Sequence, residues 1–175
     1  MDARLGSEPT PTKNRTTAER RSERELVVTR TFHFPARVVF GAWTNPELFK
    51  RWWAPKSFGL NMLSCEADVR VGGRYRLLFS HPAAPQPMEF FGRYLEVVPH
   101  SRLVWTNEEG GDGGQVTTVT FEERGGKTLL VMHDLYPSKD ALDEAIASGS
   151  TSGTGETFDQ LDELLVTLGA SGGGS

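Results

Sequence analysis

His133 and Asp134 stand next to each other in the sequence and close to Tyr136. A histidine beside a carboxylate can be tuned as a general base, which makes the pair a candidate catalytic dyad. Neighbours on a β-strand face opposite sides of the sheet, however, so the two side chains cannot pair if this segment is a strand. We therefore expect a single inward polar anchor, His133 or Asp134, with His133 and Tyr136 supplying hydrogen bonds to a ligand.

The other histidines and the single cysteine do not form a metal site. His33, His81 and His100 fall at a predicted strand end and in turns beside proline, without metal-ligand spacing between them. Cys65 is alone, which excludes an intramolecular disulfide and a zinc site built on cysteines. It lies on the apolar face of a predicted strand, where an unreactive thiol is expected. We expect no metal and no cofactor.

A glycine-rich segment at Gly110–Gly114 resembles a phosphate-binding loop only in composition. It joins two predicted strands and does not begin a helix, so no helix dipole is available to hold an anion. We expect a mobile hairpin turn.

Aromatic residues crowd the segment that follows the first predicted strand. They are Trp43, Phe49, Trp52, Trp53 and Phe58. The simplest interpretation is that they fill the core beneath two short helices. Trp52 and Trp53 point about 100° apart if they share a helix, so one could lie in the core while the other lines a cavity.

Charged residues alternate along the predicted hairpin at Glu66, Asp68 and Arg70 and at Arg74 and Arg76. Ion pairs between strands on the solvent face explain this pattern. The alternative is an inward polar wall whose arginines would bind an acidic ligand.

A sheet and a few helices must position these side chains. Leu26–Phe34 is rich in β-branched and aromatic residues and predicts a strand that ends before Pro35. A short helix follows, and Asn45-Pro46 begins a second one that Pro55 ends. Runs that alternate or are rich in β-branched residues predict further strands around 63–71, 75–79, 88–98, 103–107, 116–123 and 128–136. Their connections are too short for parallel crossovers, so the sheet is antiparallel.

A helical period follows the last strand. Ser138 is a candidate N-cap, and apolar residues recur from Leu142 to Leu168. Glycines between Gly149 and Gly155 interrupt the period, and we favour one bent helix over two. Together these elements predict an α+β helix-grip fold. In it a curved antiparallel sheet of about six to seven strands wraps around a long C-terminal helix, with two short helices after strand 1 and a pocket between sheet and helix.

The length and net charge of the chain limit the number of domains and the kinds of partner that we expect. The 175 residues suit one domain, and a net charge of −4 leaves no basic stripe for nucleic acid. The apolar runs are too short for membrane insertion, no signal peptide is recognisable, and we expect a cytoplasmic protein. We expect a disordered polar tail over 1–24, the folded domain over 25–169 and a flexible Gly/Ser tail over 170–175.

Seven short motifs along the chain carry a resemblance to a known family. They are Arg30–Phe32, Pro35-Ala36, Trp43–Leu48, Trp52–Pro55, Cys65–Tyr75, Gly92–Pro99 and Leu103–Thr106. They resemble the SRPBCC, or START-like, superfamily, in the branch similar to the C-terminal domain of the activator of the heat-shock protein 90 ATPase. The resemblance implies a helix-grip fold and, for similar members, binding of hydrophobic small molecules, cyclase or hydratase chemistry, lipid carriage or chaperone regulation. Relatives often carry methionine and aromatic residues around 150–158. The serines and threonines in this stretch of the chain argue against a purely apolar ligand.

We expect the protein to bind a hydrophobic or amphipathic small molecule in an internal cavity, with cyclase or hydratase chemistry left open. The expected cavity-lining residues are Trp43, Trp53, Phe58, Tyr75, Phe90, Trp105, His133, Tyr136 and Phe158. The alternative is a protein-interaction module that regulates a chaperone ATPase, with the chaperone as its partner. An exposed edge of the open sheet could also support a weak homodimer.

Overall fold

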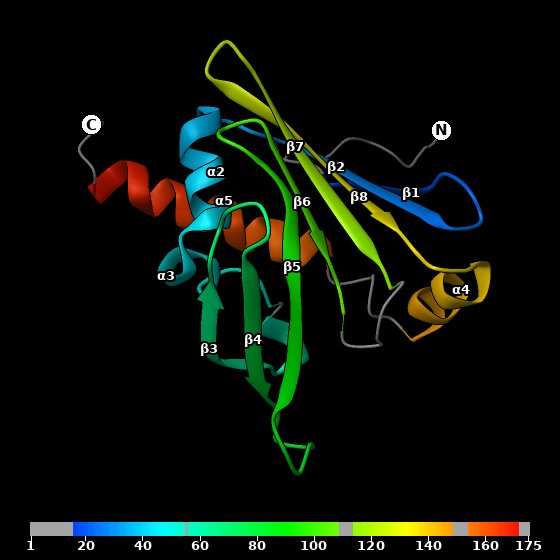
Figure 1. Cartoon of the computed structure of the whole chain (residues 1–175). Coiled ribbons are helices and arrows are strands. Elements are labelled where there is room, and N and C mark those ends of the chain that lie inside the picture. Colours follow the sequence, from blue (N-terminus) through cyan, green and yellow to red (C-terminus); the bar gives the residue numbers. More distant parts are fainter. Residues whose placement is uncertain (1–15, 55, 109–113, 149–153, 172–175) are drawn as a thin grey trace, which may run out of the picture.

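The computed structural model describes residues 16–54, 56–108, 114–148 and 154–171. Within them the chain forms one antiparallel sheet of eight strands in the order β1-β2-β8-β7-β6-β5-β4-β3 (Figure 1). The strands are β1 (Thr17–Arg20), β2 (Glu25–Phe32), β3 (Asn61–Ala67), β4 (Arg74–Ser80), β5 (Met88–Val98), β6 (Arg102–Thr106), β7 (Val116–Arg124) and β8 (Lys127–Leu135). The helical elements are α2 (Ala36–Thr44), α3 (Pro46–Phe49), the 3-10 turn η1 (Lys56–Phe58), α4 (Lys139–Ala147) and α5 (Thr154–Ser171).

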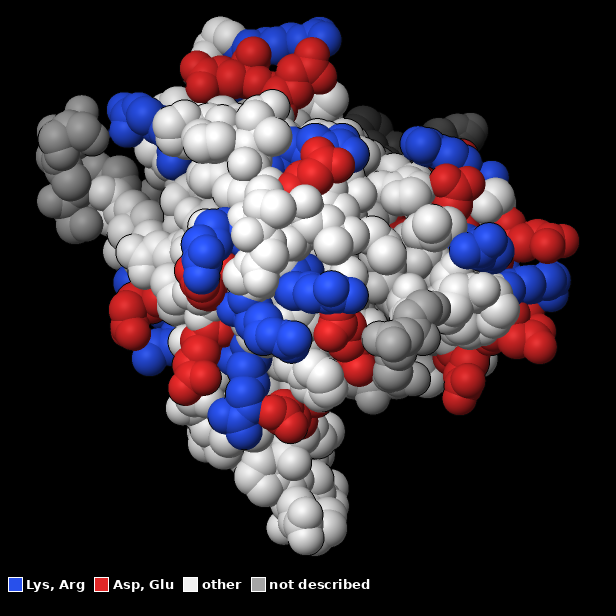
Figure 2. Space-filling model, in the orientation of Figure 1, with Lys and Arg blue, Asp and Glu red and all other residues white. Residues whose placement is uncertain are grey.

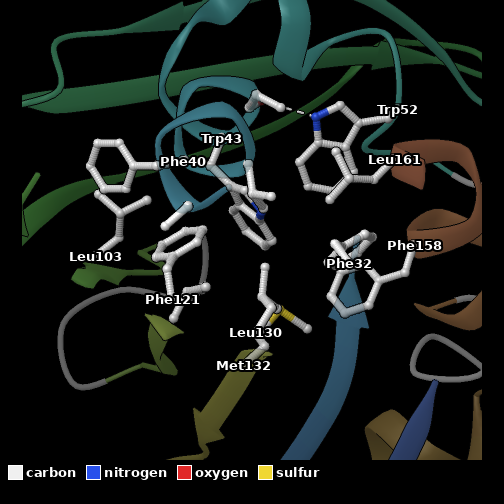
Figure 3. Packing of buried hydrophobic residues seen from close by; sticks show 14 of the residues in the cluster. Phe32, Phe40, Trp43, Trp52, Leu103, Phe121, Leu130, Met132, Phe158 and Leu161 are labelled. Carbon is white, nitrogen blue, oxygen red and sulfur yellow. Dashed lines mark hydrogen bonds between the residues drawn. The ribbon is translucent and has the colours of Figure 1, made fainter. Parts of the chain in front are cut away.

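The predicted α+β helix-grip fold is confirmed. Helices α2 and α5 lie against one face of the sheet, where α2 contacts β7 and β8 and α5 contacts β2 (Figure 1). The buried core between these layers combines aliphatic side chains with many aromatic rings. In Figure 3, Trp43 of α2 lies between Phe40 and Phe121 on one side and Trp52 and Phe158 on the other.

Strand alternation decides which side chains face this core. Along β8 the residues Thr128, Leu130, Met132 and Asp134 are buried, and the residues between them are only half-buried. The same alternation buries every second residue at the start of β7. The sheet therefore has one inner face, and the register of each strand determines which side chains lie on that face.

The sheet bends where β5 passes from pairing with β4 to pairing with β6, beside a register shift between Tyr94 and Glu96. Gly92 lies at this bend. A Cβ atom placed on it would be 2.0 Å from the carbonyl oxygen of Thr106. Glycine is required there because the two backbones approach too closely for any side chain.

The predicted helix starts are confirmed at two caps. The Asn45 side chain accepts a hydrogen bond from the Glu47 amide at 3.0 Å, with Pro46 in the first turn of α3. The Ser138 hydroxyl accepts one from the Ala141 amide at 3.0 Å and begins α4. Pro55, the predicted end of the second helix, lies outside the described residues.

Two predictions about the chain ends need correction. Residues 17–20, expected within the disordered tail over 1–24, form β1 and pair with β2, which brings the described sheet to eight strands. The single bent helix expected at the C-terminal end is two helices, because α4 ends at Ala147 and α5 begins at Thr154. α4 packs Leu142 against Leu26 and Tyr136, well away from most of α5 (Figure 1). The tails over 1–15 and 172–175 lie outside the described residues.

Candidate functional site

A cavity of about 430 Å³ lies between the sheet and the helical side of the fold. Its wall is mostly apolar and rich in aromatic rings. The helical side contributes Trp43, Phe49, Trp53, Phe58 and Phe158, and the sheet contributes Tyr75, Phe79, Phe90, Tyr94 and Trp105. Leu26, Leu77 and Met132 add aliphatic surface. Such a mostly apolar enclosure with a few polar groups is typical of small-molecule sites.

The structure brings eight of the nine expected residues to this cavity. They are Trp43, Trp53, Phe58, Tyr75, Phe90, Trp105, Tyr136 and Phe158. Phe90 is 40% exposed as well as lining the cavity, which places it where the cavity meets solvent.

His133 is the exception, and its assignment to the cavity is wrong. Its Nε2 lies 2.8 Å from Oε2 of Glu25, on the face of the sheet opposite the core. Hydrogen bonds from His133, and then from Ser22, lower the pKa of Glu25 below its ordinary value. The sequence predicted that only one of two strand neighbours could face inward, and that residue is Asp134.

Asp134 is the acidic residue among the described residues that line the cavity. It is 6% exposed, and its Oδ1 accepts a hydrogen bond of 2.6 Å from the Thr117 hydroxyl on β7. Removal from water raises the pKa of this carboxyl, while hydrogen bonds from Thr117 and Gln115 act in the opposite direction. The carboxyl is thus held in place but reluctant to ionise.

Further polar side chains continue from Thr117 through hydrogen bonds. The Asn107 amide donates to the Thr117 hydroxyl at 3.2 Å, and the Tyr75 hydroxyl donates to the Thr106 carbonyl at 2.6 Å, with Oδ1 of Asn107 3.4 Å away. Asn107, Thr117 and Tyr75 all line the cavity. The group therefore offers fixed donors and acceptors within a mostly apolar space.

Tyr136 also lines the cavity and is 8% exposed. Burial is the main cause that raises the pKa of its phenol, and the nearby Asp134 adds to it. A phenol that stays protonated can donate a hydrogen bond to a bound molecule.

Asn107, Gln115 and Thr117 were not predicted as site residues. The alternation of strand 116–124 marks Thr117 as sharing a face with Val119 and Phe121, and that signal could have found it. Thr117 lies opposite Asp134 because of the register in which β7 pairs with β8. That register could not be predicted from the sequence.

One of the two adjacent tryptophans lies in the core and the other lines the cavity, although they do not share the helix expected from the sequence, because α3 ends at Phe49 and both lie in the turn after it. Trp52 is fully buried in the core, and its Nε1 donates to the Ala42 carbonyl at 3.0 Å (Figure 3). Trp53 lines the cavity and stacks on Phe49 with ring centroids 4.8 Å apart. One ring therefore supports the fold while its neighbour shapes the site.

Polar residues of α5 hold the segment that carries Trp53. The Gln160 amide donates to the carbonyls of Trp52 at 3.0 Å and Ala54 at 2.9 Å, and its oxygen accepts from the Lys56 amide at 2.8 Å. The Thr157 hydroxyl donates to the Trp53 carbonyl at 3.3 Å. The polar character of this part of α5 thus positions one wall of the cavity as well as adding polar surface to it.

Cys65 lines the cavity, where burial raises the pKa of its thiol to about 11. A thiol that resists ionisation is a poor nucleophile, as the sequence predicted. Within the described ranges no group of histidine, cysteine and carboxylate residues could hold a metal ion.

The charged hairpin residues face away from the cavity, as preferred from the sequence. Arg76 pairs with Glu89, and Arg70 pairs with Asp68 at 2.7 Å. Acidic and basic side chains are interspersed on this face of the molecule (Figure 2). The alternative of an inward wall of arginines is therefore wrong. Most of the 110–114 loop lies outside the described residues.

No helix in the described part of the chain is long and apolar enough to cross a membrane. The curated proteins contain no match to the chain.

Solved structures with this fold come from several bacteria. A protein of Rhodobacter sphaeroides has a TM-score of 0.79 at 23% identity, covering 88% of this chain and 99% of its own. A protein of Nitrosomonas europaea has a TM-score of 0.76 at 24% identity, covering 85% and 98%. An AHSA1-like protein of Aeromonas hydrophila has a TM-score of 0.61 at 20% identity, covering 82% and 94%. At these identities the likeness concerns the fold.

Residues 33–166 match the model of the family described as activator of Hsp90 ATPase homolog 1-like protein. The match includes α2, α3 and every strand from β3 to β8, which are the elements that enclose most of the cavity. The chain therefore belongs to the activator of Hsp90 ATPase homolog 1-like family.

Proposed function

We propose that the protein binds an amphipathic small molecule in the cavity between its sheet and helices. The family fold is of a kind that binds small ligands in general. The observation that carries the proposal is the cavity itself. Its volume of about 430 Å³ falls within the usual range of ligand pockets, and its walls are mostly apolar and rich in aromatic rings.

The distribution of polar groups supports an amphipathic ligand. Thr117 and Asp134 are hydrogen-bonded to each other in the wall, whereas Trp53, Phe58 and Phe90 are among the rings elsewhere in it. A ligand with an apolar body and one polar group could satisfy both regions. A purely apolar ligand would leave the buried carboxyl without a new partner.

Tryptophan fluorescence offers a direct assay, because Trp43, Trp53 and Trp105 line the cavity. The purified full chain would be titrated with neutral amphipathic probes such as 2-(2-naphthyl)ethanol, and the stoichiometry would be checked by native mass spectrometry. We expect saturable quenching with one probe per chain.

A matched pair of variants tests where the probe binds. Ala67→Leu adds three carbon atoms to a side chain that lines the cavity, and Glu66→Leu places the same side chain on the exposed face of the same strand. Binding should weaken in Ala67→Leu and persist in Glu66→Leu. Equal binding to both variants, or no binding to the wild type, would refute the proposal.

A second candidate rests on the description of the matched family, which names activation of the Hsp90 ATPase. The partner would then be a chaperone, bound by the surface and not the cavity. Addition of the full chain to an Hsp90-type ATPase should raise its turnover if this candidate is correct. Unchanged turnover at micromolar protein would count against it.

A further inference from the structure

The described residues that line the cavity include an acidic side chain but no basic one. Asp134 is the acidic residue among the described residues that line it, and no lysine, arginine or histidine is present among them. His133, the nearest basic residue in sequence, lies on the opposite face and contacts Glu25. A negatively charged ligand would therefore meet a buried carboxyl without a compensating cation.

The fixed position of Asp134 makes it a recognition group. Thr117 donates to one carboxyl oxygen at 2.6 Å, and the side chain is 6% exposed. Its neighbours in the cavity, Tyr136 and Met132, are also largely buried. A donor on the ligand would meet an acceptor that is already oriented and shielded from water.

The aromatic walls favour the same kind of ligand. Trp43, Trp53 and Trp105 line the cavity together with Tyr75 and Tyr94. The faces of such rings carry partial negative charge and attract cations, tryptophan most strongly. Two independent features, the carboxyl and the rings, therefore point to a positive group on the ligand.

We propose that the cavity selects small molecules that join an aromatic or apolar body to a single basic amine, which Asp134 binds. This inference rests on the proposed function and specifies its ligand class. The ligand amine and the Asp134 carboxyl together hold one ionisable proton. The complex is therefore neutral overall, either as ammonium with carboxylate or as amine with carboxylic acid. A carboxylate of the same shape would need an additional proton or leave a net negative charge in the cavity.

A series of three ligands tests this selection. The ligands share a 2-naphthyl body and an ethyl linker and end in a primary amine, an alcohol or a carboxylate. Isothermal titration calorimetry with the full chain should rank their affinities as amine, then alcohol, then carboxylate. The amine should bind at least about tenfold more tightly than the alcohol, as expected for a charge-assisted hydrogen bond. Equal affinities, or tighter binding of the carboxylate, would overturn the inference.

Variants identify the residue responsible. Asp134→Asn keeps the shape and should reduce the preference for the amine over the alcohol to within about threefold. Asp140→Asn removes the same charge from an exposed position on α4 and should leave the preference unchanged. A preference that survives in Asp134→Asn would overturn the role of Asp134, and the wild-type ranking remains a test if that variant does not fold.

The same experiment separates this inference from the proposed function. If the alcohol binds in the cavity and the amine binds no more tightly, the amine selection is wrong while the ligand-binding function stands. If none of the three ligands binds, the proposed function fails first.

Discussion

Gln160 of α5 donates its side-chain amide to the main-chain carbonyl of Trp52 at a distance of 3.0 Å. Its side chain also contacts the backbone of Ala54 and Lys56, so one residue fixes the end of the segment that places Trp52 in the core and Trp53 in the cavity. The link joins positions 108 residues apart in the sequence.

Replacing Gln160 should loosen this link. Gln160→Leu keeps the volume but leaves buried carbonyls without donors, which should lower the free energy of unfolding by about 1–3 kcal/mol. Urea denaturation would measure the loss. Glu163→Leu on the exposed side of the same helix is the control and should change stability by less than about 0.5 kcal/mol. Equal effects of the two variants would contradict the structural role of Gln160.

Arg30 and Asp159 should respond unequally to substitution. Arg30 on β2 is 3% exposed and pairs at 2.6 Å with Asp159 on α5, which is 63% exposed. Asp159→Ala leaves the buried guanidinium without its carboxylate and hydrogen-bonded to the Thr16 hydroxyl, and should cost about 1.5–3 kcal/mol. Arg30→Met removes the buried charge and leaves a carboxylate that water can solvate.

Urea unfolding of both variants checks this order. The expected result is that Asp159→Ala is the less stable of the two. A larger loss in Arg30→Met would mean that the packing of the arginine stem outweighs its charge.

The stability of the protein should depend on pH through Asp134. Burial raises the pKa of this carboxyl in the folded state above its ordinary value of 3.8, so the folded chain retains a proton that the unfolded chain has lost. As the pH rises from 3.8 through the raised pKa, the wild type therefore loses stability, and the loss is complete above that pKa. Asp134→Asn has no such proton.

The measurement is the difference in unfolding free energy between Asp134→Asn and wild type across that range. The difference should increase in favour of the variant as the pH rises and then level off. A difference that stays constant with pH would show that Asp134 ionises equally easily in both states.

Trp52 and Trp53 should have separable roles. Trp52→Phe loses buried surface and the hydrogen bond to Ala42, which should cost about 1–3 kcal/mol of stability. Trp53→Phe retains an aromatic ring at the cavity and should cost less while weakening ligand binding. Denaturation and calorimetry on both variants would test the division, and the reverse order of stability losses would contradict it.

The fold was predictable where local patterns are strong. The cap at Asn45 and the helix start at Ser138 each follow from nearby residues. The alternation from Cys65 to Val71 predicted a strand that is too long, because β3 ends at Ala67 and Val71 is 64% exposed. β1 was missed because all four of its residues are exposed, so it has no hydrophobic signal and exists only through its pairing with β2.

The candidate site was predictable only in part. Aromatic residues such as Trp105 indicate an apolar wall through their residue type alone. Whether His133 or Asp134 points inward depends on which face of β8 meets the core. The alternation of side chains along a strand shows only that the two point to opposite faces. Thr117 joins the site because β7 and β8 set it opposite Asp134, and such register arises from the whole sheet.

The proposed function requires that a small molecule can enter the cavity. Crystals of the full chain soaked with 2-(2-naphthyl)ethanol would test this directly. We predict density for the ring system against Trp53 and Trp105, with the hydroxyl group toward Asp134. A saturating soak that leaves the cavity empty, or side chains that close it, would contradict the account.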